Sequence, residues 1–158
     1  MAKIHQLKVS QQLPISLDEA WKFFSSPRNL DLITPDDMSF KIISGANSKA
    51  YAGQVISYQI KPLLNIPMNW VTEITQCVDK KYFIDEQRFG PYKFWHHQHH
   101  FEETEDGVLM NDMLHYALPF SFIGEIAGNL FLHNKVKHIF DYRRQKLDQI
   151  FKQDFVIA

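Results

Sequence analysis

The chain has 158 residues, of which 45% are hydrophobic and 22% charged, and its formal net charge is −1 at pH 7. This length and composition predict one compact globular domain over residues 1–158. A chain without excess positive charge lacks the field that attracts a phosphate backbone, so we expect no nucleic-acid partner.

Cysteine usage and hydropathy bear on the compartment of the protein. Cys77 is the only cysteine, which excludes an internal disulfide and a cysteine-based zinc site and favours a reducing, cytoplasmic location. Residues 1–5 lack the apolar run of a signal peptide, and no segment has the roughly 20 apolar residues of a membrane helix. We therefore expect no stable membrane insertion. No pattern in the sequence indicates an oligomeric state.

The N-terminal part of the chain predicts one strand followed by two short helices. Residues 4–13 alternate apolar and polar side chains, as a half-buried strand does. Ser16 and Glu19 have the spacing of a capping box, which predicts a short helix directly after them. A second short helix is expected over 29–33, ending before Pro35, because the residue that precedes a proline avoids the α region.

Six further strands are expected between residues 38 and 118. In most of them apolar side chains recur at every second position, and turn residues such as glycine and proline separate one strand from the next. The ranges are 38–44, 54–61, 68–74, 82–89, 92–103 and 108–118. Strands in series joined by short turns predict an antiparallel meander.

The last predicted element is one long amphipathic helix over 122–151, where apolar residues recur at helical spacing without a proline. The order of elements predicts an α+β fold in which a curved antiparallel sheet of about seven strands wraps around this helix and leaves a cavity. We interpret the basic residues of the helix as its solvated face. They are Lys135, Lys137, Arg143, Arg144 and Lys146.

Four of the eight histidines lie within five positions, between Trp95 and Phe101. Successive side chains of a strand point to opposite faces, so His97 and His99 share a face with these two aromatic residues. Buried imidazoles need hydrogen-bond partners, and a strand of an ordinary core would carry aliphatic residues instead. The pattern is therefore typical of the wall of a ligand cavity.

Asp112 lies in the apolar-facing phase of the strand 108–118, where an unpaired carboxylate would be costly. The dipeptide Asp106-Gly107 is a hairpin signal. A turn centred there places Asp112 opposite Phe101 and diagonal to His99. We therefore predict a contact between His99 and Asp112.

These segments and their order resemble the SRPBCC superfamily, the START-like or helix-grip proteins. More narrowly, they resemble bacterial ligand-binding members described as polyketide cyclase/dehydrase-like or as cell-division inhibitors. The resemblance rests on residues 70–74, 83–87, 90–92, 95–102 and 112–119. The most specific run is Gly-Pro-Tyr followed by Trp-x-His-x-His-x-Phe-Glu, onto which Gly90, Trp95, His97, His99, Phe101 and Glu102 fall. The resemblance implies a helix-grip fold with a deep apolar cavity; it does not imply one activity.

The pair His97 and His99 permits three interpretations. Two imidazoles two positions apart on a strand can contribute to a metal site, for which Asp112 or Glu73 would be the additional ligands. Alternatively, one imidazole oriented by Asp112 transfers a proton on an enolisable ketide, as in a cyclase or dehydrase. In the third, both imidazoles hydrogen-bond to Asp112, backbone or water and fix the polar end of a cavity. We favour the third and assign no metal and no cofactor.

The function predicted from the sequence is binding of a small hydrophobic or amphipathic, lipid- or polyketide-like molecule. The alternatives are a cyclase- or dehydrase-type enzyme with His97, His99 and Asp112 as its candidate catalytic residues, and a protein-interaction module with a filled cavity. The predicted ligand-binding residues are Tyr58, Trp70, Trp95, His97, His99, Phe101, Asp112 and Tyr116.

Overall fold

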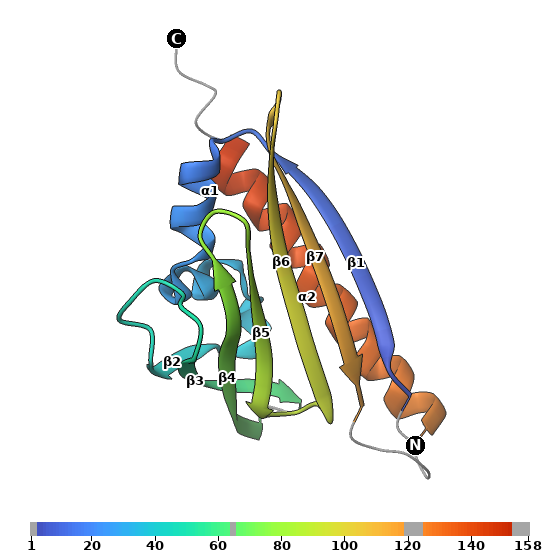
Figure 1. Ribbon diagram of the computed structural model, residues 1–158. Helices are drawn as coiled ribbons and strands as arrows, with labels where there is room; N and C mark the ends of the chain where they lie inside the picture. Colours follow the sequence, from blue (N-terminus) through green and yellow to red (C-terminus); the bar gives the residue numbers. More distant parts are fainter. Residues whose placement is uncertain (1–2, 64–65, 119–124, 153–158) are drawn as a thin grey trace.

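The computed structural model describes residues 3–63, 66–118 and 125–152. Its strands form one antiparallel sheet in the order β1-β7-β6-β5-β4-β3-β2 (Figure 1). The strands are β1 His5–Leu13, β2 Lys41–Ser44, β3 Gln54–Leu63, β4 Ile66–Val78, β5 Tyr82–Phe89, β6 Phe94–Thr104 and β7 Gly107–Ala117. The helices are α1 Leu17–Phe24, the 3-10 helices η1 Pro27–Ile33 and η2 Asp36–Met38, and α2 Glu125–Lys152.

Strands β2 to β7 form the predicted meander, and β1 pairs with β7. The long helix α2 runs along one face of the sheet, behind β6, β7 and β1 in Figure 1, and contacts β1 and η1. The predicted α+β arrangement of a curved seven-stranded sheet, short helices after the first strand and a long C-terminal helix is confirmed. Residues 122–124 of the predicted helix lie outside the described residues. No helix in the described ranges is both long and apolar enough to cross a membrane.

The capping box predicted at the start of α1 is present. The Ser16 side chain accepts a hydrogen bond from the Glu19 amide at 3.3 Å, and the Glu19 carboxylate accepts one from the Ser16 amide at 2.9 Å. The helix buries Ala20, Trp21 and Phe24 in a core cluster shared with residues of the sheet. Such a cap contributes about 1 kcal/mol, while the buried aromatic side chains anchor the helix.

The strand predicted over 38–44 is shorter than expected. Met38 is buried at the end of η2, and β2 begins only at Lys41. Ser39 separates the two elements with a φ of 46°, a left-handed conformation that ends the helical turn. Alternating apolar residues predicted the strand correctly from Lys41 onward, but alternation does not register a backbone reversal of this kind.

The hairpin between β6 and β7 has a register different by two positions from the prediction. Thr104 pairs with Gly107, so Gly107 is the first residue of β7 and the turn residues precede it. Gly107 has a φ of +118°, and a Cβ there would lie 2.3 Å from the Leu13 carbonyl oxygen. Glycine is required at this position because the end of β1 passes close to it, and the shift places Asp112 directly opposite His99.

Substitution of Gly107 by alanine should therefore destabilise the fold. We expect Gly107→Ala to lower the free energy of unfolding by about 2–3 kcal/mol, because an L-residue is strained at this φ and its Cβ meets backbone. Gly53→Ala is the matched control, since Gly53 has a φ of +90° with no atom within 4 Å of the place that an alanine methyl group would take. It should cost only about 1 kcal/mol. Equal losses in urea unfolding would contradict the role assigned to the close approach.

Two apolar clusters lie between the sheet and the helices. One contains Trp21, Phe24 and Phe101, and the other contains Trp95 and Phe140. Along β6 the aromatic residues at positions 95 and 101 belong to different clusters. The two histidines between them therefore lie at the junction of the two clusters.

Candidate functional site

Adjacent strands and the long helix bring five polar side chains together at this junction. His97 and His99 lie on the inner face of β6, Asp85 pairs opposite His97 from β5, and Asp112 pairs opposite His99 from β7. Arg143 reaches the same group from α2. Their side chains are 2% exposed for Asp112, 7% for each histidine, 9% for Arg143 and 16% for Asp85. This is a buried polar cluster with both signs of charge.

Asp112 holds both imidazoles from one side. Its Oδ1 atom lies 3.1 Å from His97 Nε2 and 2.9 Å from His99 Nδ1. The guanidinium Nη2 of Arg143 lies 3.7 Å from the same oxygen and 3.4 Å from His99 Nδ1. The shorter distance to the carboxylate indicates that the His99 Nδ1 proton is donated to Asp112. The predicted contact between His99 and Asp112 is present.

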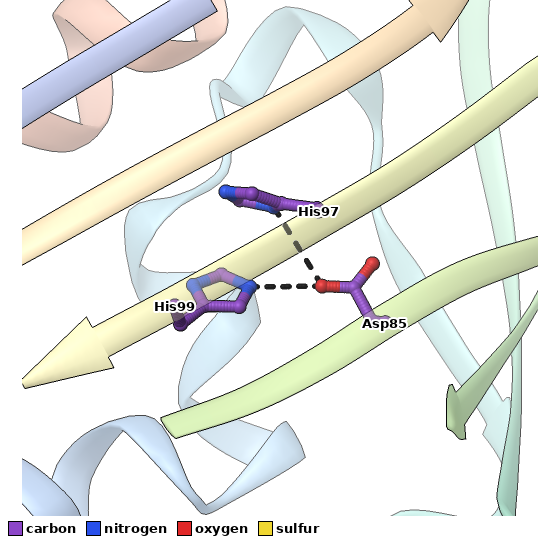
Figure 2. A group of neighbouring side chains, drawn as sticks. All are labelled: Asp85, His97 and His99. Carbon is purple, nitrogen blue, oxygen red and sulfur yellow. Dashed lines mark hydrogen bonds and ion pairs between the residues drawn. The ribbon is translucent and has the colours of Figure 1, made fainter. Parts of the chain in front are cut away.

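Asp85 faces the remaining nitrogen of each imidazole. Its Oδ2 atom lies 2.8 Å from His99 Nε2 and 3.6 Å from His97 Nδ1, the two contacts drawn in Figure 2. The two imidazole rings are 3.8 Å apart between their centroids. Each histidine is thus placed between two carboxylates, one on each neighbouring strand.

The carboxylates of the cluster are stabilised in the ionised form. Burial alone would raise the pKa of Asp112, but the charge of Arg143 and the hydrogen bonds from the two imidazoles hold it well below its usual range. Burial likewise opposes ionisation of Asp85, but the hydrogen bond from His99 and the neighbouring positive charges lower the pKa of Asp85. Both aspartates are therefore anionic at neutral pH.

The pKa values of the two histidines shift in opposite directions. Burial disfavours an imidazolium at His99, yet the hydrogen bonds to Asp112 and Asp85 outweigh it and raise the pKa of His99. Burial and the charge of His99 dominate at His97 and lower the pKa of His97 despite its contact with Asp112. When His99 is protonated and His97 is neutral, the two carboxylates are balanced by one imidazolium and one guanidinium. Such neutrality lets a charged cluster exist in an apolar interior.

The cluster borders a cavity of about 160 Å³. Asp85, His97, His99 and Arg143 contribute polar side chains to its wall, and aliphatic and aromatic residues from α1, η1, β3, β4 and α2 contribute most of the rest. The arrangement presents charged and hydrogen-bonding groups to a largely apolar space, as small-molecule sites do.

Solved structures share the fold of this chain although their sequences are only distantly similar. A protein of unknown function from Staphylococcus aureus, SA2116, superimposes with a TM-score of 0.71 at 11% identity, covering 97% of this chain and 96% of that one. TTHA0849 from Thermus thermophilus gives a TM-score of 0.67 at 11% identity, covering 90% and 97%. The di-domain ARO/CYC StfQ from the steffimycin biosynthetic pathway gives 0.74 at 7% identity, covering 98% of this chain and 52% of StfQ.

The sheet order, the helix along its inner face and these superpositions decide the architecture. The chain has the helix-grip fold. No protein-family model matches the sequence, and a search of curated proteins finds no match. At these identities the likeness shows the fold, and the site has to be argued from the chain's own residues.

The helix-grip cavity is lined by five of the eight residues predicted to bind a ligand. They are Tyr58, Trp70, Trp95, His97 and His99. The other three are not among its described lining residues. Phe101 packs in the core, with its ring centroid 5.7 Å from that of Trp21. Asp112 lies behind the two imidazoles, and the Tyr116 hydroxyl hydrogen-bonds to His133 Nδ1.

Two members of the cluster were missed by the sequence interpretation. Arg143 was assigned to the solvated face of α2, which is wrong, because it is buried over Phe24 and against Asp112. It follows Phe140 by three positions and precedes Leu147 by four, so the helical period places it on the apolar stripe. Asp85 shares the strand phase of the buried Phe83. A lone carboxylate in that phase is the same signal that identified Asp112.

Glu73, considered as a metal ligand from the sequence, does not belong to the cluster. Its carboxylate forms an ion pair with Arg88 at 2.6 Å on the other face of the sheet. His96 and His100 also lie on that other face and are half-buried, and His96 Nδ1 lies 2.9 Å from the Glu86 carboxylate. The two faces of β6 therefore carry separate sets of histidines.

Three buried polar atoms within the described residues have no hydrogen-bond partner in the protein. They are Ser25 Oγ, Trp70 Nε1 and Arg143 Nε. All three residues line the cavity. Because buried polar groups are nearly always hydrogen-bonded, this coincidence requires an explanation.

Proposed function

We propose that the chain binds a small, mainly apolar molecule that carries hydrogen-bond acceptors, in the cavity between the sheet and the helices. The observation that carries this proposal is the cavity wall, in which Asp85, His97, His99 and Arg143 contribute polar side chains among aliphatic and aromatic residues. Trp70 Nε1 and Arg143 Nε are donors only, and the Ser25 hydroxyl can donate or accept. These three atoms lie on wall residues but have almost no accessible surface, so a bound molecule would satisfy them only after their side chains rotate toward the cavity.

The size of the cavity narrows the class of ligand. Its volume of about 160 Å³ is close to that of an apolar cavity of about 150 Å³ that accommodates benzene. Cavities that enclose drug-sized ligands measure about 300–1,000 Å³. A compact oxygenated ring compound, as in a small polyketide, fits this volume better than a long acyl chain does. Its polar substituents would face Arg143 and the histidine pair.

The sequence left two alternative functions, an interaction module and a cyclase- or dehydrase-type enzyme. A filled cavity would favour an interaction module, and a cavity of this size disfavours that function. Cyclase- or dehydrase-type catalysis is favoured by one observation, that His97 touches the cavity while Asp112 fixes its ring. The likeness to StfQ is one of fold and adds no reaction. Catalysis is thus the second candidate.

Native mass spectrometry of freshly purified protein, followed by solvent extraction, tests binding directly. We expect a retained compound, or saturable binding of oxygenated ring compounds from a panel. Ala50→Leu places a larger side chain in the cavity wall and should weaken binding at least about tenfold, or about 1.4 kcal/mol. Ala52→Leu, two residues away at an exposed position outside the wall, is the matched control. Absence of any bound compound, or equal binding by both variants, would refute the proposal.

A further inference from the structure

The ring nitrogens of His97 and His99 that face away from Asp112 converge on one oxygen of Asp85. Asp112 Oδ1 lies within hydrogen-bond distance of His97 Nε2 and His99 Nδ1, so these nitrogens carry the protons in neutral imidazoles. The lone pairs of His97 Nδ1 and His99 Nε2 then point toward Asp85 Oδ2, at 3.6 and 2.8 Å. Three electron-rich atoms would face one another here unless His99 Nε2 carries a proton, as it does in its hydrogen bond to Asp85, and a metal cation would take the place of that proton.

We propose that His97 Nδ1, His99 Nε2 and Asp85 Oδ2 form a binding site for a divalent transition-metal ion such as Zn²⁺, in the wall of the cavity. This inference does not depend on the organic ligand proposed above, because the three protein donors suffice to hold the ion. It goes beyond the sequence interpretation, which sought the third ligand in Asp112 or Glu73 and assigned no metal.

The two distances that involve Asp85 fit such an ion. Donors bound at about 2.0–2.2 Å in a tetrahedral site lie about 3.3 Å apart. The two Asp85 contacts, at 3.6 and 2.8 Å, differ from this separation by about half an ångström or less, and all three donor atoms lie within 4.8 Å of one another. Small side-chain rotations would make the two Asp85 distances equal. Figure 2 shows both imidazoles turned toward the same carboxylate oxygen.

Asp112 supplies the outer shell that metal-binding histidines usually have. A ligating imidazole typically donates its other ring N–H to a carboxylate, which fixes its orientation and strengthens it as a ligand. Here one buried carboxylate, only 2% exposed, accepts from both imidazoles. Pairing of this kind pre-orients the rings before any ion arrives, so little conformational entropy is lost on binding.

The donor set indicates the class of ion and its role. Two imidazoles and one carboxylate suit zinc or ferrous iron, whereas calcium and magnesium prefer oxygen ligands. All three ligand residues border the cavity, so a remaining coordination position would face it and accept water or an oxygen of a small molecule. Three protein ligands with one open position is the arrangement of catalytic rather than structural zinc.

Metal binding is measured on the full chain without an affinity tag, after dialysis against a chelator. Isothermal titration calorimetry and native mass spectrometry with Zn²⁺ should give one ion per chain, and Ca²⁺ should give none. Asp85→Asn keeps the size of the side chain and should weaken Zn²⁺ binding at least about 100-fold. Asp112→Asn should weaken it about 10–100-fold at unchanged stoichiometry. Circular dichroism establishes that each variant is folded.

The control is the double variant His96→Gln, His100→Gln, which removes the histidines on the other face of β6. It should bind Zn²⁺ as the unmodified chain does. In addition, Co²⁺ bound to the unmodified chain should show the visible absorption of a four- or five-coordinate ion, a readout that needs no variant. Absence of binding at millimolar Zn²⁺, unchanged affinity in Asp85→Asn, or loss of binding only in the control would overturn the proposal.

Discussion

Replacement of Asp112 by asparagine is expected to lower the free energy of unfolding by about 3 kcal/mol near pH 6. The substitution preserves the size of the side chain but removes the charge that faces two imidazoles and Arg143. An amide satisfies these donors less well, and the positive groups are then buried without their main counter-charge. Urea unfolding of metal-free protein measures the loss.

This loss in the free energy of unfolding should become smaller both at low pH and at high pH. Because the folded pKa of Asp112 is depressed, its contribution is present above about pH 4 and is lost as pH falls through the folded value. Because the folded pKa of His99 is raised, its contribution is present below about pH 6.5 and is lost as pH rises through the folded value. The difference between the two proteins should be largest between these limits.

A control carboxylate separates this effect from a general effect of charge. Asp106 lies exposed in the turn before β7, and Asp106→Asn should change the free energy of unfolding by no more than about 0.5 kcal/mol. A loss at Asp112 that does not vary with pH would mean that packing, rather than charge, stabilises the cluster.

The elements of this fold were largely predictable from sequence because each has one buried face. Alternation predicted the strand 54–61, which occurs as Gln54–Leu63, and helical spacing predicted α2 to within a few residues. Boundaries failed where backbone conformation, rather than burial, decides them, as at Ser39 with its left-handed φ. The resemblance to helix-grip proteins supplied what periodicity lacks, namely how the sheet and the last helix are arranged.

The site was predictable in part because a buried polar residue in an apolar phase is a strong local signal. It identified His97, His99 and Asp112, and the contact of His99 with Asp112 follows from strand pairing even though the predicted register was two positions off. The register error came from assigning Gly107 to the turn. Gly107 is instead the first residue of β7, and a glycine is needed there because the end of β1 passes close to it. Such an approach joins segments far apart in sequence, which no local pattern reports.

Arg143 shows a different limit of sequence reasoning. A basic residue between Tyr142 and Arg144 on a helix has the composition of a solvated face, yet Arg143 is 8% exposed and Arg144 is exposed. The charge of Arg143 favoured a position in solvent, whereas its helical spacing from Phe140 and Leu147 favoured a position in the core. The buried carboxylates on β5 and β7 explain why Arg143 is buried, because an apolar residue at this position would leave the two anions with too little positive charge.

Arg143→Met should accordingly lower the free energy of unfolding by about 2–3 kcal/mol at neutral pH. Methionine retains much of the apolar length of the side chain, so the loss reports the missing charge near Asp112 and over the Phe24 ring rather than an empty volume. Arg144→Met is the matched control, because the Arg144 side chain is exposed. We expect it to change the free energy of unfolding by no more than about 0.5 kcal/mol.

Combining Arg143→Met with Asp112→Asn tests whether the two residues act as one charge-balanced unit. Once Asp112 is neutral, the guanidinium has lost its nearest carboxylate, and removing it relieves a buried, poorly compensated charge. The double variant should therefore lose less stability than the two single variants together, by about 1–2 kcal/mol in a double-mutant cycle. Strict additivity in urea unfolding would mean that Arg143 stabilises the fold by packing alone, and that the neutrality of the cluster does not explain its burial.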